Sequence, residues 1–147
     1  MPRNIYSHAV GVERRAGRRS VVVSRVVDAS EARVWDLLTD TTRWRDWGPS
    51  VAAVDAPTRY IETGTTGRVR VAGVGVWVPF EVDSYVDGAE KRWTWTVARV
   101  PATGHRVESV GVDDQCRVAF EVPLLAAGYV PVCRRALDRI AAIVEGE

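Results

Sequence analysis

Cysteine, histidine and lysine are scarce in this sequence of 147 residues. The two cysteines, Cys116 and Cys133, have no metal-ligand spacing, and we expect two buried reduced thiols in preference to a disulfide. The two histidines, His8 and His105, are too few for a histidine-rich metal site, and no cofactor-binding motif is present. Lys91 is the one lysine beside 19 arginines, which we interpret as a bias of base composition and not as phosphate recognition. The sequence therefore predicts neither a metal nor a cofactor.

Long apolar runs and an excess of one charge are also missing. No stretch approaches the length of a membrane span, and the first ten residues lack the apolar run of a signal peptide. A cytoplasmic location without a membrane span is therefore expected. The net charge is +1, which gives no overall field to attract nucleic acid or an anionic membrane.

The length of the chain corresponds to one domain, large enough to bury roughly 70% of its unfolded surface. Residues 1–19 have weak periodicity and many charges, including Arg14, Arg15, Arg18 and Arg19. We interpret this segment as a solvated N-terminal arm with at most a short ordered piece near residues 5–12, and residues 20–147 as the single domain.

The start of the domain changes from a strand pattern to a helix pattern. Residues 20–28 are dense in valine, whose branched side chain suits a pleated sheet. From residue 29 the apolar residues recur about every 3.6 residues, which predicts a first short helix with Ser30 as its capping residue. Trp44 and Trp47 lie three residues apart in a second short helix, which Gly48-Pro49 ends.

The remainder alternates short strands and turns and closes with a helix. We expect strands over residues 51–56 (extended by 59–62), 68–72, 76–86, 92–100, 105–112 and 116–122. The short connections between them predict an antiparallel meander. Apolar residues then recur at helical spacing over residues 124–144, with Pro131 near the start of the main helix.

This order of elements leads to a geometrical prediction. A helix is about 10 Å across, whereas six strands span about 25 Å, so one helix cannot fill the concavity of such a sheet. Either side chains fill the remainder or a cavity is left. At ~24 cal/mol per Å³, a dry void of ~500 Å³ would cost roughly 12 kcal/mol, the whole stability of a typical domain. A cavity of that size is therefore expected to hold water or an apolar guest.

Several motifs resemble a known superfamily. The sequence contains Val-x-Asp-Ala-Ser-x-x-x-Val-Trp at residues 26–35, Leu-x-Asp at 38–40 and Trp-x-x-Trp-x-Pro at 44–49. These motifs, followed by Pro-Phe-Glu-Val at residues 79–82 and Arg-Trp-Thr-Trp at 92–95, resemble the polyketide cyclase/dehydrase and lipid-transport (SRPBCC, or START-like) superfamily. The glycine-rich loop of the plant-allergen branch is reduced to Gly64-x-x-Gly67.

The resemblance implies an α+β helix-grip fold. In this fold a curved antiparallel sheet of six or seven strands wraps around a long C-terminal helix, two short helices follow the first strand, and a hydrophobic pocket lies between sheet and helix. The superfamily runs from passive binders to aromatase/cyclases, so membership predicts the type of pocket better than the chemistry.

Eight residues are candidates for binding a ligand. They are Trp44, Trp47, Arg70, Phe80, Trp93, Trp95, His105 and Tyr129. Trp93 and Trp95 share one strand face, where they either stack on a flat ligand or form ordinary core. Trp44 and Trp47 either line the pocket mouth or pack the helix pair onto the sheet.

His105 and Arg70 are the weak candidates for catalysis. A histidine pKa near neutrality suits general acid–base chemistry, although a lone histidine at a turn is more often solvated or structural. Arg70 lies on a strand among apolar neighbours, where it points either into the cavity or to the convex solvent face.

Three functions remain open from the sequence. The leading one is binding of a small hydrophobic ligand, aromatic, polyketide-like or lipid-like, by a monomer or homodimer. The second is an aromatase/cyclase reaction on a polyketide-like substrate, assisted by His105 and Arg70. The third is a protein-interaction module with a vestigial pocket.

Overall fold

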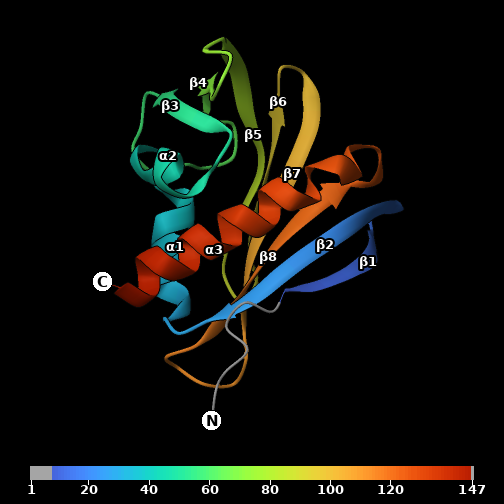
Figure 1. Ribbon diagram of the computed structural model, residues 1–147, viewed down its shortest axis with the longest axis vertical. Coiled ribbons are helices and arrows are strands. Elements are labelled where there is room, and N and C mark those ends of the chain that lie inside the picture. Colours follow the sequence, from blue (N-terminus) through green and yellow to red (C-terminus); the bar gives the residue numbers. More distant parts are fainter. Residues whose placement is uncertain (1–7, 147) are drawn as a thin grey trace.

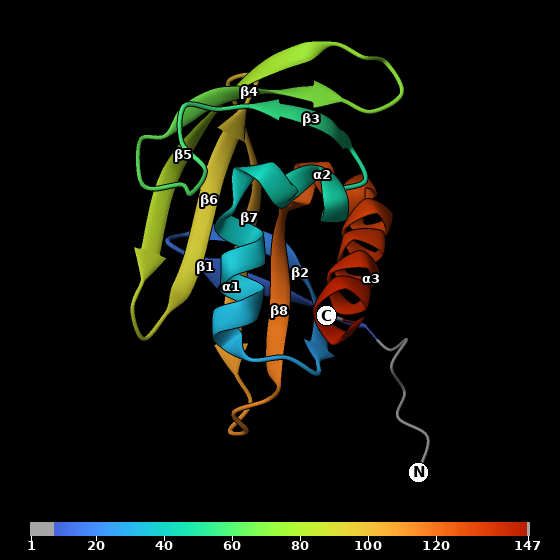
Figure 2. The ribbon, with the colours of Figure 1, turned by 90° about the vertical axis from the view of Figure 1, so that its left-hand side faces the viewer.

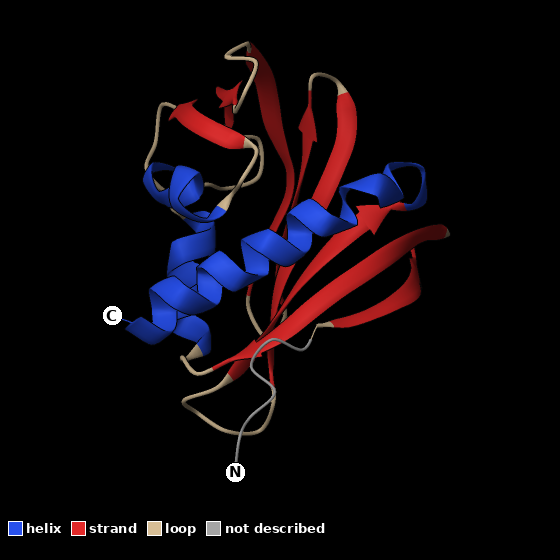
Figure 3. Cartoon of the chain, in the orientation of Figure 1, coloured by secondary structure: helices blue, strands red, loops and turns tan. Residues whose placement is uncertain are grey.

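A computed structural model describes residues 8–146 and shows one curved antiparallel sheet with a long helix, α3 (Val130–Gly146), across one face (Figure 1, Figure 3). The strands are β1 (Ala9–Arg15), β2 (Arg18–Val27), β3 (Val51–Asp55), β4 (Thr66–Val71), β5 (Trp77–Asp87), β6 (Lys91–Val97), β7 (Val100–Ser109) and β8 (Cys116–Pro123). Their spatial order is β1-β2-β8-β7-β6-β5-β4-β3. The fold class is therefore α+β as expected, and the architecture fits a helix grip.

Helices α1 (Glu31–Thr39), η1 (Thr41–Arg43) and α2 (Trp44–Trp47) follow β2. The Ser30 hydroxyl accepts a hydrogen bond from the Arg33 amide at 3.3 Å, which caps α1 as the sequence predicts. The Asp40 side chain accepts from the Thr42 amide and caps η1 in the same way. Figure 2 shows α1, α2 and α3 on the same side of the sheet.

The C-terminal helix follows the short helix η2 (Leu124–Tyr129), and Pro131 lies in its first turn. Pro131 costs little at this position because the first amides of a helix have no intrahelical partner. The buried side of α3 faces the sheet with Cys133, Ala136, Leu137, Ile140, Ala141 and Val144. An ion pair of 2.6 Å between Arg25 and Asp138 also joins β2 to α3.

The sheet has eight strands, so the expected count of six or seven is wrong. The additional strand comes from the segment interpreted as an arm, of which residues 1–7 lie outside the described part. Residues 9–15 form β1 and pair antiparallel with β2 through a turn in which Ala16 and Gly17 have positive φ angles of 52° and 76°. All residues of β1 are exposed, so no buried face marks this strand in the sequence. The expected strand over residues 59–62 is also wrong, because only an isolated bridge between Asp40 and Tyr60 forms there.

The outer face of the sheet, opposite the helices, holds a network of ion pairs around the buried carboxylate of Glu121. Arg92 donates to both Glu121 carboxylate oxygens, at 2.7 and 2.9 Å, and Arg106 donates to Glu121 at 3.0 Å and to Glu13 of β1 at 2.6 Å. Burial alone would raise the pKa of Glu121, but the hydrogen bonds and positive charges of the two arginines hold it below its ordinary value. Gly104 leaves room for this carboxylate, because a Cβ there would lie 2.7 Å from Oε1. The network thus ties β1 to β7 across two intervening strands.

Candidate functional site

A cluster of aromatic side chains lies between the sheet and the helices. Trp44 of α2 stacks on Trp93 of β6 with ring centroids 5.2 Å apart and an interplanar angle of 7°. Phe80 and Trp95 each meet Trp44 edge to face, at 5.3 and 5.2 Å. Trp44 and Trp93 are among the largest fully buried side chains of the described residues.

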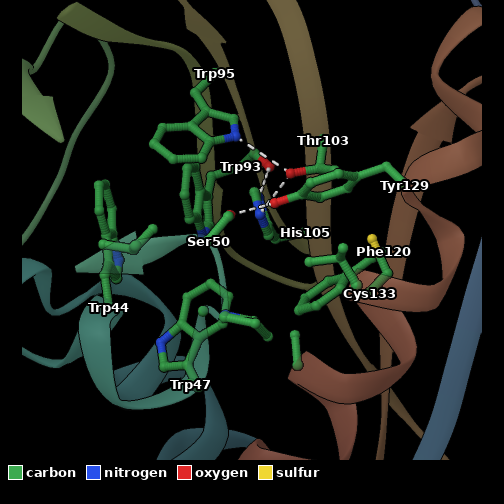
Figure 4. Close-up of a pocket in the computed structure, with 15 residues that line it drawn as sticks. Trp44, Trp47, Ser50, Trp93, Trp95, Thr103, His105, Phe120, Tyr129 and Cys133 are labelled. Carbon is green, nitrogen blue, oxygen red and sulfur yellow. Dashed lines mark hydrogen bonds between the residues drawn. The ribbon is translucent and has the colours of Figure 1, made fainter. Parts of the chain in front are cut away.

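Only a small internal cavity of about 40 Å³ remains beside this cluster (Figure 4). A dry cavity of about 150 Å³ accommodates one benzene molecule, so this cavity has room for water and not for an aromatic guest. Of the two alternatives that the sequence leaves open, side chains filling the space or a cavity, the first describes this part of the space between sheet and helix. The tryptophans that the sequence suggested as walls of a cavity occupy much of its space instead.

A larger apolar groove of about 280 Å³ adjoins this cavity. It lies between η2 and strands β3 to β8, and is lined by Ser50, Val51, Val69, Val71, Val78, Trp95, Val97, Val100, Pro101, Ala102, Thr103, Val122, Ala126 and Tyr129. Five of these residues, Ser50, Val51, Trp95, Thr103 and Tyr129, also line the cavity and so mark the junction of the two spaces. At this junction the hydroxyl groups of Ser50 and Tyr129 hydrogen-bond at 2.5 Å (Figure 4).

His105 lies in the wall of the cavity and belongs to a chain of hydrogen bonds. The Trp95 indole donates to Thr103 Oγ1 at 3.2 Å, and Thr103 Oγ1 is 3.0 Å from His105 Nε2. His105 Nδ1 is 3.4 Å from the Trp93 carbonyl, which can only accept. Nδ1 therefore carries a hydrogen, and in the neutral imidazole Nε2 accepts from the Thr103 hydroxyl.

The surroundings of His105 favour this neutral form. The imidazole is 2% exposed and stacks on Trp93 at 3.9 Å between centroids. Burial lowers its pKa to about 3. Cys133 lines the same cavity, and burial raises the pKa of its thiol to about 12. Neither group is an effective base or nucleophile near neutral pH, because a base with so low a pKa binds a proton weakly and a thiol is a poor nucleophile.

Six of the eight predicted residues line the cavity: Trp44, Trp47, Trp93, Trp95, His105 and Tyr129. Phe80 is buried behind Trp44 and Trp95 and lines neither the cavity nor the groove. Arg70 is exposed on β4 and lines neither space, so the structure does not bring it to His105.

Sequence reasoning missed Ser50 and Thr103. Thr103 lies two residues before His105 on the same strand. Side chains alternate between the two faces of a strand, so both residues lie on the same face. The predicted strand begins at residue 105 and therefore leaves Thr103 out. In the structure β7 begins at Val100, five residues before the predicted start, because the β6–β7 turn is Ala98-Arg99 and not the segment 101–104. Ser50 lies in a loop, where no periodic pattern identifies it.

Among residues 8–146, no three or more His, Cys, Asp or Glu side chains lie together where they could hold a metal ion. In the same range, no helix is long and apolar enough to cross a membrane.

Comparison with known proteins gives a family and a fold. A family model described as polyketide cyclase/dehydrase and lipid transport matches residues 18–145. XoxI from Bacillus cereus is similar in structure, with a TM-score of 0.67 and 11% identity over 86% of this chain and 95% of that chain. The Zhui aromatase/cyclase from Streptomyces sp. R1128 has a TM-score of 0.65 and 14% identity over 86% and 93%. No curated protein sequence matches the chain.

Proposed function

This chain belongs to the polyketide cyclase/dehydrase and lipid-transport family, and from that premise we propose that it binds a small apolar ligand in the groove beside η2. The observation that carries the proposal is the groove itself, about 280 Å³ in volume and lined by side chains of which none is charged. Ligand sites in proteins are concave and mostly apolar with a few convergent polar groups, and here Thr103, Ser50 and Tyr129 supply those groups.

The size of the groove favours a ligand of about two fused rings or an equivalent aliphatic chain, since one benzene occupies a cavity of about 150 Å³. A flat aromatic molecule that buries about 150–200 Å² of apolar surface would gain about 4–5 kcal/mol from leaving water. Trp95 and Tyr129 supply aromatic surface for contact with such a ligand.

An aromatase/cyclase reaction is the second candidate. The hydrogen-bonded Thr103–His105 pair in the wall of the site supports it, because a cyclase needs polar groups near a bound carbonyl. Proton transfer by His105 would be inefficient, however, because its pKa of about 3 lies far below neutrality. Binding is therefore the better supported function.

Thermal unfolding with and without naphthalene tests the proposal. At a free ligand concentration ten times Kd, binding to the folded state adds about 1.4 kcal/mol, which corresponds to a rise in Tm of roughly 3–6 °C for a chain of this size. Ala126→Trp should abolish the rise because the new indole fills the groove from η2. Ala127→Trp is the matched control, because Ala127 follows Ala126 in η2 but lines neither the groove nor the cavity.

Two outcomes contradict the proposal. One is the absence of any Tm shift with naphthalene, larger aromatics or fatty chains, which would favour an interaction module with a vestigial pocket. The other is a shift of equal size in wild type and Ala126→Trp, which would move the binding site away from the groove.

A further inference from the structure

We propose that the ligand of this site is uncharged and carries a hydroxyl group, which donates a hydrogen bond to Thr103 and accepts one from the Ser50–Tyr129 pair. This inference rests on the proposed function and specifies the class of molecule bound. Two independent features support it: the absence of charge in the lining, and the number of hydrogen-bonding positions left open at the junction of groove and cavity.

The lining contains no Asp, Glu, Lys or Arg side chain in either space. The charges of Glu121 and Arg92 lie on the outer face of the sheet and are bonded to each other at 2.7 Å. A carboxylate entering the groove would lose its hydration without meeting a cation, which is strongly unfavourable. The site therefore selects neutral ligands over anionic ones of the same shape.

Thr103 has one open position, and that position is an acceptor. Its hydroxyl hydrogen is donated to His105 Nε2, and one of its two lone pairs accepts from the Trp95 indole. The second lone pair has no hydrogen-bond donor among the described contacts. A ligand group that meets Thr103 must therefore donate a hydrogen.

The Ser50–Tyr129 pair has the complementary position open. Each hydroxyl carries one hydrogen, and their mutual hydrogen bond uses only one of the two. Whichever hydroxyl donates in that bond, the other retains a hydrogen that can be given to a ligand oxygen. A ligand hydroxyl both donates and accepts, so it matches both positions, whereas a ketone matches one and a carboxylate lacks the hydrogen that Thr103 requires.

Binding of 2-naphthol, naphthalene and 2-naphthoate, measured by calorimetry at about pH 7, tests this inference, because there the naphthol is neutral and the naphthoate ionised. The hydroxyl group of 2-naphthol is hydrated, so moving 2-naphthol from water into an apolar site costs more free energy than moving naphthalene. Tighter binding of 2-naphthol would therefore have to come from hydrogen bonds in the site. We expect wild type to bind 2-naphthol at least tenfold tighter than naphthalene, and to bind 2-naphthoate more weakly than 2-naphthol by a similar factor or more.

Three variants assign this preference to Thr103. Thr103→Val keeps the shape of the side chain but removes its hydroxyl, and should bring 2-naphthol and naphthalene within about twofold of each other. Thr103→Ser retains the hydroxyl and should restore the preference, which separates recognition from a general loss of fold. Thr94→Val changes a threonine of β6 outside the groove and the cavity, and should behave as wild type.

The outcomes separate this inference from the proposed function. If none of the three compounds binds wild type, the proposed function fails. If naphthalene binds but 2-naphthoate binds as tightly as 2-naphthol, or Thr103→Val keeps the preference for 2-naphthol, the groove is a binding site and the assignment of a neutral hydroxyl ligand is overturned.

Discussion

The buried neutral His105 should make the stability of this protein depend on pH in a range where most carboxylates remain ionised. Its pKa of about 3 in the folded state lies below its value of 6.5 in the unfolded chain. The unfolded chain therefore takes up a proton first as pH falls. The stabilisation is complete above pH 6.5 and is lost progressively as pH drops toward the folded-state pKa. Between about pH 7.5 and pH 5, a single group with these pKa values costs about 2 kcal/mol of unfolding free energy.

Urea unfolding followed by tryptophan fluorescence measures this loss at each pH. His105→Gln offers an amide oxygen to the Thr103 hydroxyl without a titrating ring, so it should flatten the profile between about pH 7.5 and pH 5 even if it lowers stability throughout. His8→Gln is the control, because it also removes an imidazole, here one that hydrogen-bonds to Asp138. Parallel profiles for wild type and His105→Gln, or a His105 imidazole resonance that titrates near pH 6.5, would refute the assignment of a buried neutral ring.

Further variants test the packing, the ion pairs and the backbone. Trp44→Ala should cost about 3–5 kcal/mol in urea unfolding because it empties the stacked cluster, whereas Trp77→Ala, at a side chain 40% exposed, should cost about 1 kcal/mol or less. Glu121→Gln should cost about 3 kcal/mol because it leaves the buried Arg106 and the partly buried Arg92 without their carboxylate, and the exposed Glu81→Gln should be nearly neutral; equal effects would contradict the ion-pair argument. Arg99→Gly should raise Tm and add about 0.5–1 kcal/mol, since Arg99 has a φ of 65° in the β6–β7 turn; a lower Tm would exclude strain there.

The parts of the fold that bury one face could be predicted from the sequence. α1 and α3 show clear periods, since each presents an apolar side to the core, and β2 is marked by its run of valines. β1 shows no clear period because it is exposed along its whole length and is held by backbone pairing with β2 and by an ion pair to Arg106, which is distant in the sequence. The start of β7 was predicted five residues too late because Ala98 and Arg99 make a tight turn at positive φ without the glycine or asparagine that usually signals one.

The site could be predicted only in part. Tryptophans on one strand face point inward by simple alternation, and Trp93 and Trp95 do so. Whether they border a cavity or fill it depends on how closely Trp44 approaches them, and that distance is set by the loop and helix geometry between β2 and β3. His105 was a candidate from the sequence, but its hydrogen bond to Thr103 could not be inferred, because Thr103 belongs to the unpredicted start of β7.

The pairing of β2 with β8 has a consequence for biosynthesis. Ser20 lies opposite Pro123, so the two strands that meet are about 100 residues apart in the chain. Translation proceeds at about 5–20 residues per second, so roughly 5–20 seconds pass between the synthesis of the valine-rich β2 and that of its partner β8. During that interval an apolar strand with one unpaired edge is open to chaperones and to other nascent chains, so expression yield should fall with slower translation of the segment between the two strands more than with changes elsewhere.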